Sequence, residues 1–234
     1  MHQPSTSSFL KDAVRELATG VASALSSGGH GPVSGDLSPA TGADGYAPAA
    51  VRVLGADFLL PHLLFGTRPG EAELALFRQA VQSYPPRADA APTVVWSHWA
   101  MTRTLHRLTG PGPTGPGPTG PEPAVGRLDV ADWRTLSHQL AVLAPLALPG
   151  EDCAVARVAR QRPLDLARGF VRAVRRRDWL QAAGAGRWLT VLDGVPQTLG
   201  LDSGLDFVEL MADGDPQVGL QVRAARLLRA GALV

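Results

Sequence analysis

The stretch PTVVWSHWAMTRTLHRL, residues 92–108, gives the clearest sign of how this chain folds. One set of its side chains recurs at intervals of 4, 3, 4 and 3 residues: Val94, His98, Met101, Leu105 and Leu108. Side chains three and four residues apart lie on one face of an α-helix, whereas a strand alternates its faces every two residues. The stretch therefore predicts a helix with one face in a protein core.

Similar stripes recur on both sides of this stretch. They predict further helices over 8–26, 67–84, 133–143, 163–177, 179–192, 204–211 and 216–228. An apolar run over 47–65 contains Pro61, and we expect a kink or break there because proline removes a helix hydrogen bond. Asp129 or Asp132 is a candidate N-cap before Trp133. Alternating strands are nearly absent, so we expect an all-α fold, either an irregular multi-helix bundle or a short helical-hairpin array.

One segment near the end of the chain resembles a known repeat. Its characteristic residues are Asp215, Pro216, Gln217 and Val218, followed by Arg223, Ala224, Ala225 and Leu228. This segment is similar to the second half of a HEAT-type repeat, and no copy at a fixed period occurs elsewhere in the chain. The resemblance covers residues 215–228 of 234 and implies a mode of helix packing only.

Glycine and proline mark the boundaries of the expected folded parts. The chain has 26 Gly and 20 Pro, and they concentrate in residues 28–48 and 110–126. Segments of this composition bury too little apolar surface to hold one conformation. We therefore expect residues 1–46 to form an amphipathic helix tethered by a flexible segment. Residues 47–234 are expected to form a helical domain interrupted by a disordered loop at 109–126.

The composition excludes several kinds of chemistry. Cys153 is the single cysteine, so the chain has no intramolecular disulfide and no multi-cysteine metal site. Lys11 is the single lysine, and its surroundings resemble neither a phosphate-binding loop nor a Schiff-base lysine. Ile and Asn are absent, and 21 of the 22 basic residues are arginine, a bias that indicates a high-GC genome. We expect no cofactor.

The sequence also carries a prediction about location. The N-terminal residues lack the charged start and apolar core of a secretory signal. The best candidate for a membrane span, residues 56–65, has about half of the required length. We therefore expect a soluble cytoplasmic protein without a membrane span.

Residues 96–106 hold the densest group of side chains capable of chemistry. Trp96, His98, Trp99 and His106 form a candidate interface or cleft, because tryptophan is enriched at interfaces. No histidine lies three or four residues from another histidine or from Cys153, so the spacing predicts no metal site. Assembled catalytic motifs are lacking, and an enzyme with a dispersed site around His98, His106 or His138 and an acidic residue is one alternative.

Charge is unevenly distributed along the second half of the chain. Residues 151–187 hold nine Arg and four acidic residues, whereas residues 188–234 hold six acidic residues and three Arg. The candidate residues for binding a partner or polyanion are Arg168, Arg172, Arg175, Arg176 and Arg177. A basic stripe attracts nucleic-acid phosphates or an acidic protein. The same arginines can instead pair with the acidic C-terminal quarter, and the sequence leaves both readings open.

These observations favour a protein-interaction role over catalysis. We expect an intracellular helical adaptor, accessory or regulatory protein whose partner is another protein. The first alternative is a nucleic-acid-associated protein using the arginine belt at 157–187, although the sequence pI of about 8.0 is low for a dedicated nucleic-acid domain. The second alternative is the helical enzyme with a dispersed site.

Overall fold

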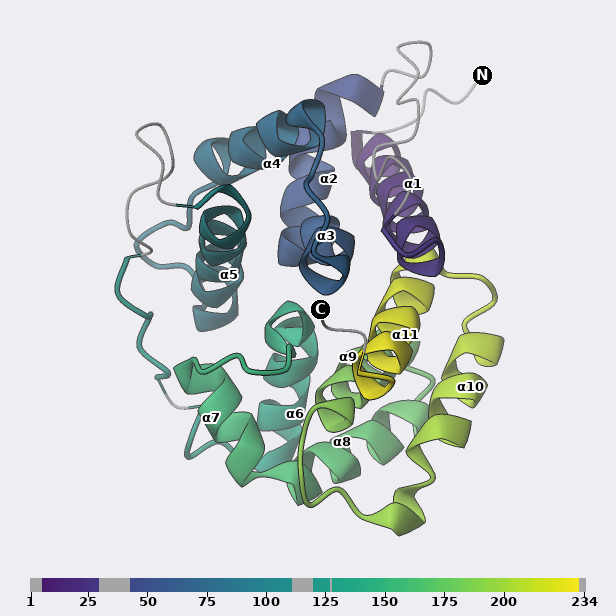
Figure 1. Cartoon of the computed structure of the whole chain (residues 1–234). Coiled ribbons are helices and arrows are strands. Elements are labelled where there is room, and N and C mark those ends of the chain that lie inside the picture. The colour runs from purple at the N-terminus through teal and green to yellow at the C-terminus, as the bar shows by residue number, and fades with distance from the viewer. Residues whose placement is uncertain (1–5, 30–42, 111–119, 127, 232–234) are drawn as a thin grey trace. The chain divides into compact units, whose positions relative to one another are not determined.

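The computed structural model describes residues 6–29, 43–110, 120–126 and 128–231 (Figure 1). Within these ranges the regular secondary structure is helical and no strand is present, which confirms the all-α prediction. The chain divides into two compact units. The first comprises residues 1–90 and 97–121, and the second comprises residues 91–96 and 122–233.

The first unit contains the N-terminal helices. Its elements are α1 (Thr6–Ser26), η2 (Ala43–Tyr46), α2 (Ala47–Leu54), η3 (Gly55–Leu59), α3 (Leu60–Phe65), α4 (Glu71–Ser83) and most of α5 (Pro92–Thr109). α5 begins where the 92–108 stretch predicts. Its buried face includes Met101 and Leu105 as expected, but also Trp96 and Trp99, while Val94 is 41% exposed. The helix is oriented so that the tryptophans rather than Val94 face the core, because burying their larger apolar area stabilises the fold more.

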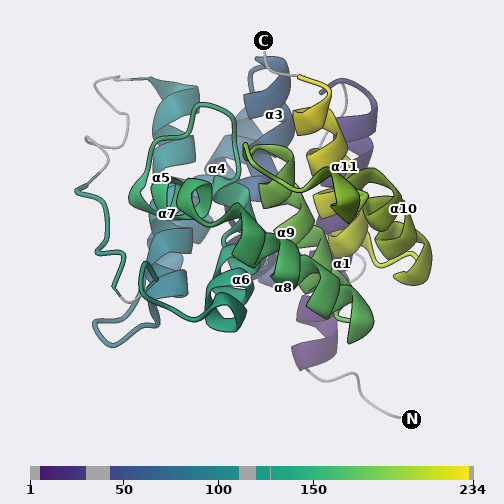
Figure 2. The same cartoon turned by 90° about the horizontal axis from the view of Figure 1, so that it is seen from below.

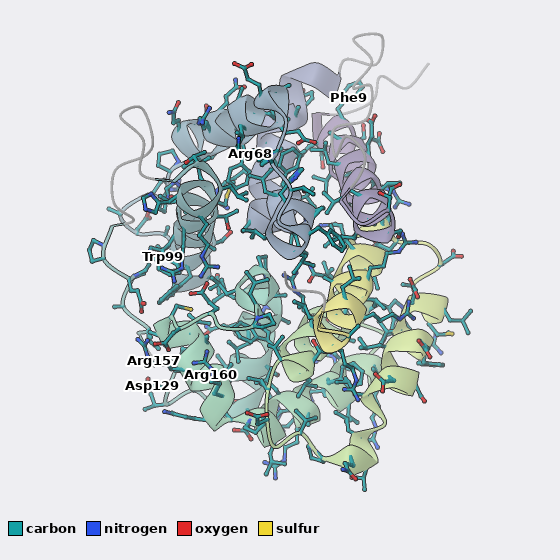
Figure 3. The ribbon with its side chains drawn as sticks, viewed as in Figure 1. Phe9, Arg68, Trp99, Asp129, Arg157 and Arg160 are labelled. Atoms are coloured by element: carbon teal, nitrogen blue, oxygen red, sulfur yellow. The ribbon has the colours of Figure 1, made fainter. Side chains whose placement is uncertain are left out.

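Helix α1 is packed into the core of the first unit. The sequence instead predicts a helix that is only tethered by a flexible segment. Its Leu17, Ala18 and Val21 are buried, and the helix packs against α2, η3 and α3. Phe9, near its start and labelled in Figure 3, stacks on Tyr46 with ring centroids 6.0 Å apart. Burying the apolar stripe stabilises this docked position. The expected flexible segment lies largely in 30–42, outside the described residues.

The apolar run over 47–65 is interrupted earlier than Pro61. Gly55 has a φ of 64°, a conformation that favours glycine, and η3 separates α2 from α3 there. Pro61 lies in the first turn of α3, where its missing N–H costs no helix hydrogen bond. By length and composition alone, Ala47–Phe65 could cross a membrane, yet 67% of its most apolar window is buried inside the structure.

Helix α4 starts later than predicted, at Glu71 rather than near Thr67. Gly70 is its N-cap, and the Gly70 amide donates to Oε2 of Glu73 at 2.9 Å. Thr67 is engaged elsewhere, because its hydroxyl lies 2.9 Å from Nδ1 of His62. Glu73 therefore provides the stabilisation at the start of the helix that was expected from Thr67.

The second unit is built around α9. Its elements are α6 (Trp133–Val142), η4 (Ala144–Leu146), α7 (Ala154–Gln161), α8 (Pro163–Arg175), α9 (Trp179–Thr190), η5 (Gln197–Leu199), α10 (Leu201–Met211) and α11 (Pro216–Arg229). α9 packs against α6, α8, α10 and α11 (Figures 1 and 2). Asp132 and Asp215 cap α6 and α11 as predicted, each accepting hydrogen bonds from backbone amides of the first turn.

Small residues allow the helices of the second unit to approach closely. A Cβ atom at Gly184 of α9 would lie 2.5 Å from the carbonyl oxygen of Ala141 in α6. A Cβ at Gly169 of α8 would overlap the side chain of Ser137 in α6. Nε1 of the buried Trp188 donates to the Leu140 carbonyl at 2.6 Å. The α6, α8 and α9 helices thus form a tightly packed base for the surface that they carry.

The loop predicted over 109–126 is described only in part. Thr109 is the last residue of α5, and residues 111–119 lie outside the described part of the chain. In the second unit, Glu122 accepts a hydrogen bond from the Ala154 amide at 2.9 Å and lies 3.3 Å from Arg157 of α7. Arg157 is labelled in Figure 3. Glu122 therefore attaches this end of the predicted loop to the unit.

Candidate functional site

The candidate site lies on α8, whose two faces differ in character. Leu166, Phe170 and Ala173 recur at helical spacing and are buried. Arg168, Arg172 and Arg175 recur at the same spacing on the other side of the helix. Pro163 starts the helix, and Arg176 is its C-cap. The amphipathic pattern therefore places an arginine stripe beside the packed base of the second unit.

A groove of about 630 Å³ lies along this stripe. Its apolar lining consists of Trp133, Leu164, Ala167, Val171, Pro196 and Leu199. Thr198 and four arginines complete it: Arg168, Arg172, Arg175 and Arg176. α8 supplies most of these side chains, α6 supplies the tryptophan, and residues 196–199 supply the rest. A pocket of this size that combines apolar walls with a few polar groups is typical of a binding site.

A smaller and more polar cavity, of about 290 Å³, shares Arg172 and Arg176 with the groove. Its other lining residues are Arg134, His138, Ala173, Asp178 and Gln181. Asp178 is the N-cap of α9 and accepts a hydrogen bond from the Gln181 amide at 3.3 Å. The two cavities are adjacent, because Arg172 and Arg176 line both of them.

The Trp133 ring, part of the groove lining, lies close to two arginines. The guanidinium carbon of Arg134 lies 4.6 Å from the ring centroid, and that of Arg172 lies 5.9 Å from it. Cations at these distances are attracted by the negative face of an indole. The indole therefore helps to hold two arginines near each other without neutralising them.

Most other arginines of the second unit are paired with carboxylates. Arg162 lies 2.6 Å from Asp165, and Arg226 lies 2.7 Å from Glu209. Further pairs are Arg157 with Glu122 and Asp152, Arg160 with Asp152, Arg168 with Asp165, Arg226 with Asp206, and Arg229 with Asp202. Within the described part of the chain, Arg172, Arg175 and Arg176 have no carboxylate partner. These three arginines line the groove, and their positive charge is not paired with a carboxylate.

This distribution resolves the question that the sequence left open. The acidic residues of α10 form ion pairs with arginines of α11 rather than with the α8 stripe. Because the acidic residues of α10 pair with α11, they leave the positive charge of the α8 stripe in place. Of the five predicted binding residues, Arg168, Arg172, Arg175 and Arg176 line the groove. Arg177 has a φ of 58° in the turn after α8 and lines neither cavity.

The side chains of the candidate cluster at 96–106 make contacts inside the protein. Trp96 is 1% exposed and donates to the Ala124 carbonyl, and Trp99 is 7% exposed and donates to the Gly120 carbonyl. Nε2 of His98 lies 3.1 Å from the Val81 carbonyl oxygen, so this ring connects α5 to α4. Burial lowers the pKa of His98, with Arg52 acting in the same direction and the Val81 hydrogen bond opposing it. His106 is partly buried.

A buried polar group in the first unit was not found from the sequence. His62 and Glu73 are 4% and 6% exposed, with Nε2 of His62 and Oε2 of Glu73 3.2 Å apart. Thr67 lies on the other ring nitrogen of His62. His62 belongs to α3, Thr67 to the turn after it and Glu73 to α4, so their contacts connect these three segments. Glu73 also accepts a hydrogen bond from the Gly70 amide. Among the described residues, no group of three His, Cys, Asp or Glu side chains is arranged to hold a metal ion.

Seven of the eleven residues that line the groove were not among the predicted site residues. Trp133 precedes Arg168 by 35 residues, and Pro196 and Leu199 follow Arg176 by 20 and 23 residues, so only the folded chain brings them together. Comparison with known proteins found no matching family model, no similar curated protein and no similar solved structure.

Proposed function

We propose that this chain binds an acidic, apolar-bearing segment of a partner protein in the groove along α8. The observation that carries the proposal is the combination of uncompensated arginines with apolar walls. Arg172, Arg175 and Arg176 attract carboxylates, while Leu164, Val171 and Leu199 offer contacts to apolar side chains. Leu164 and Val171 are 55% and 38% exposed, so a ligand would remove apolar surface from water.

The chemistry of the groove favours a peptide over a nucleic acid. Nucleic-acid binding relies on phosphate contacts from a basic surface and on aromatic rings available for base stacking. Here six of the lining side chains are apolar, and guanidinium groups already lie over the Trp133 ring. A peptide segment carrying both leucine-like and acidic side chains satisfies both halves of the lining. This proposal joins the protein-interaction role to the arginines predicted from the sequence.

The test uses a labelled helical peptide with Leu or Phe on one face and Glu on the flanks, followed by fluorescence anisotropy. Arg176→Glu should weaken binding about tenfold or more, which corresponds to about 1.4 kcal/mol. Arg177→Glu is the matched control, because it makes the same change in net charge one residue away but outside both cavities. It should change the affinity by no more than about twofold.

Two further ligands separate the proposal from a simple charge effect. A peptide of the same charge without apolar residues should bind weakly, because it leaves the walls of the groove in water. Duplex DNA should lose affinity equally in the two variants, if it binds at all. Equal losses for the amphipathic peptide in Arg176→Glu and Arg177→Glu, or stronger binding of DNA than of the peptide, would contradict the proposal.

A further inference from the structure

The smaller cavity beside the groove has the chemistry of an anion site. We propose that it is a phosphate-binding subsite, which accepts a phosphorylated Ser or Thr of the segment in the groove. As a statement about that segment, the inference rests on the proposed function. The subsite itself rests on the side chains that line the cavity and is tested separately below.

The lining comes from three helices of the tightly packed base. α6 contributes Arg134 and His138, α8 contributes Arg172 and Arg176, and the start of α9 contributes Asp178. Three guanidinium groups and one carboxylate leave an excess of two positive charges in a cavity of about 290 Å³. Like charges gathered in this way repel one another. A bound anion of charge near −2 would remove this excess.

The charge and shape of a phosphate monoester match this lining better than a single carboxylate does. A phosphoserine carries about −1.5 to −2 charges at pH 7 and three acceptor oxygens. Guanidinium groups donate pairs of hydrogen bonds to phosphate oxygens, which is why arginine clusters recognise phosphate. A carboxylate offers one charge and two oxygens, and it would leave one positive charge of the cavity uncompensated. The carboxylate of Asp178 is already engaged as the cap of α9.

His138 adds a second kind of ligand atom. Its Nδ1 lies 3.1 Å from Oε1 of Gln181, and an amide oxygen only accepts, so Nδ1 carries the hydrogen. Nε2 has no hydrogen-bond partner among the described residues. In this tautomer Nε2 is an acceptor, which can bond the hydroxyl of a phosphate that keeps one hydrogen. The Gln181 contact fixes the ring orientation that this requires.

The position of the cavity explains why one segment would use both sites. Arg172 and Arg176 line the groove and the cavity alike, so a phosphate on them is adjacent to the apolar walls. The expected ligand therefore has a phosphorylated residue close in sequence to its apolar residues. Phosphorylation of the partner would then increase its affinity for the groove.

Three versions of the amphipathic peptide test this inference, with Ser, phosphoserine or Glu at one position. The phosphoserine peptide should bind about tenfold more tightly than the Ser peptide, with the Glu peptide in between. Arg134→Gln should abolish most of this gain and change the affinity of the Ser peptide much less, because Arg134 lines the smaller cavity and touches the groove only through the Trp133 ring. Val171→Asp, in the groove alone, should weaken all three peptides. A gain that is absent in the unaltered chain, or that survives Arg134→Gln, would overturn the inference.

Inorganic phosphate provides an arm that does not depend on the peptide. Titration should shift the His138 ring ¹⁵N signals in NMR spectra of the full chain, and Arg134→Gln should remove the shift. If phosphate shifts these signals and no peptide binds, the proposed function fails while the subsite stands for free phosphate. If peptides bind without a phosphate effect and inorganic phosphate causes no shift, the subsite fails while the proposed function stands. Failure of both arms removes both proposals.

Discussion

The contact between α6 and α9 allows the cost of one added methyl group to be worked out. In Gly184→Ala, the new Cβ would lie 2.5 Å from the Ala141 carbonyl oxygen and 3.1 Å from the Ala141 Cα. Carbon and oxygen atoms normally stay about 3.3 Å or more apart. Because the obstacle is backbone, a side-chain rotation cannot relieve the contact, and the two helices must separate by an amount on the order of 1 Å.

The separation has two costs and one gain. Overpacking of a well-packed core costs about 1–3 kcal/mol. The 2.6 Å hydrogen bond from Trp188 to Leu140 spans the same two helices, and weakening this buried bond costs about 1–3 kcal/mol. Alanine is favoured over glycine in a helix by about 1 kcal/mol. The net prediction is that Gly184→Ala lowers the free energy of unfolding by about 3 kcal/mol.

The measurement is urea unfolding followed by circular dichroism, with hydrogen exchange to locate the change. Exchange should accelerate in α6 and α9 of the variant. Gly219→Ala is the matched control, because Gly219 lies within α11 and a Cβ there meets nothing within 4 Å. The control should raise the free energy of unfolding by up to about 1 kcal/mol. A Gly184→Ala variant as stable as the Gly219→Ala control would refute the reasoning about close helix packing.

Two further predictions concern stability. Burial raises the pKa of the Cys153 thiol above its ordinary value of 9.0, so the unfolded chain loses this proton first as pH rises. The Cys153 contribution to stability is therefore fully present below about pH 9 and decreases above it. In urea unfolding, the free energy of unfolding should fall less between pH 8 and pH 10 in Cys153→Ala than in the unaltered chain. Arg162→Ala should cost about 1–3 kcal/mol in the same assay, because Arg162 pairs with Asp165 and donates to the Ala131 carbonyl at 2.7 Å. Arg175→Ala, which removes no ion pair, should stay within about 0.5 kcal/mol of the unaltered chain, and equal losses in the two variants would contradict the division of the arginines.

The sequence predicted local structure where side-chain spacing or capping chemistry determines it. The stretch at 92–108 corresponds closely to α5, and Asp132 and Asp215 cap the helices that they precede. These features depend on residues within one turn of each other. Spacing could not show that α1 docks on α2 and α3, because docking depends on the partner surface as well as on the stripe.

The candidate site shows the same difference between local and long-range information. The arginines of α8 were identifiable as a stripe, because they occur within ten residues of each other. Their lack of carboxylate partners was not predictable, since it depends on α10 pairing with α11 instead. The apolar walls come from residues 133, 164–171 and 196–199, which only the fold assembles. The tryptophans at 96 and 99 suggested an interface, but burial and hydrogen bonds assign them to packing.

The central claim is that the groove along α8 receives an acidic, apolar-bearing peptide. A photoreactive amino acid placed at Val171, within the groove, tests it most directly, with Val142 of α6 as the control. Val142 is 51% exposed and lines neither cavity. Irradiation should attach the amphipathic peptide to the Val171 variant and not to the Val142 variant. Equal attachment at both positions, or attachment at Val142 alone, would contradict the central claim.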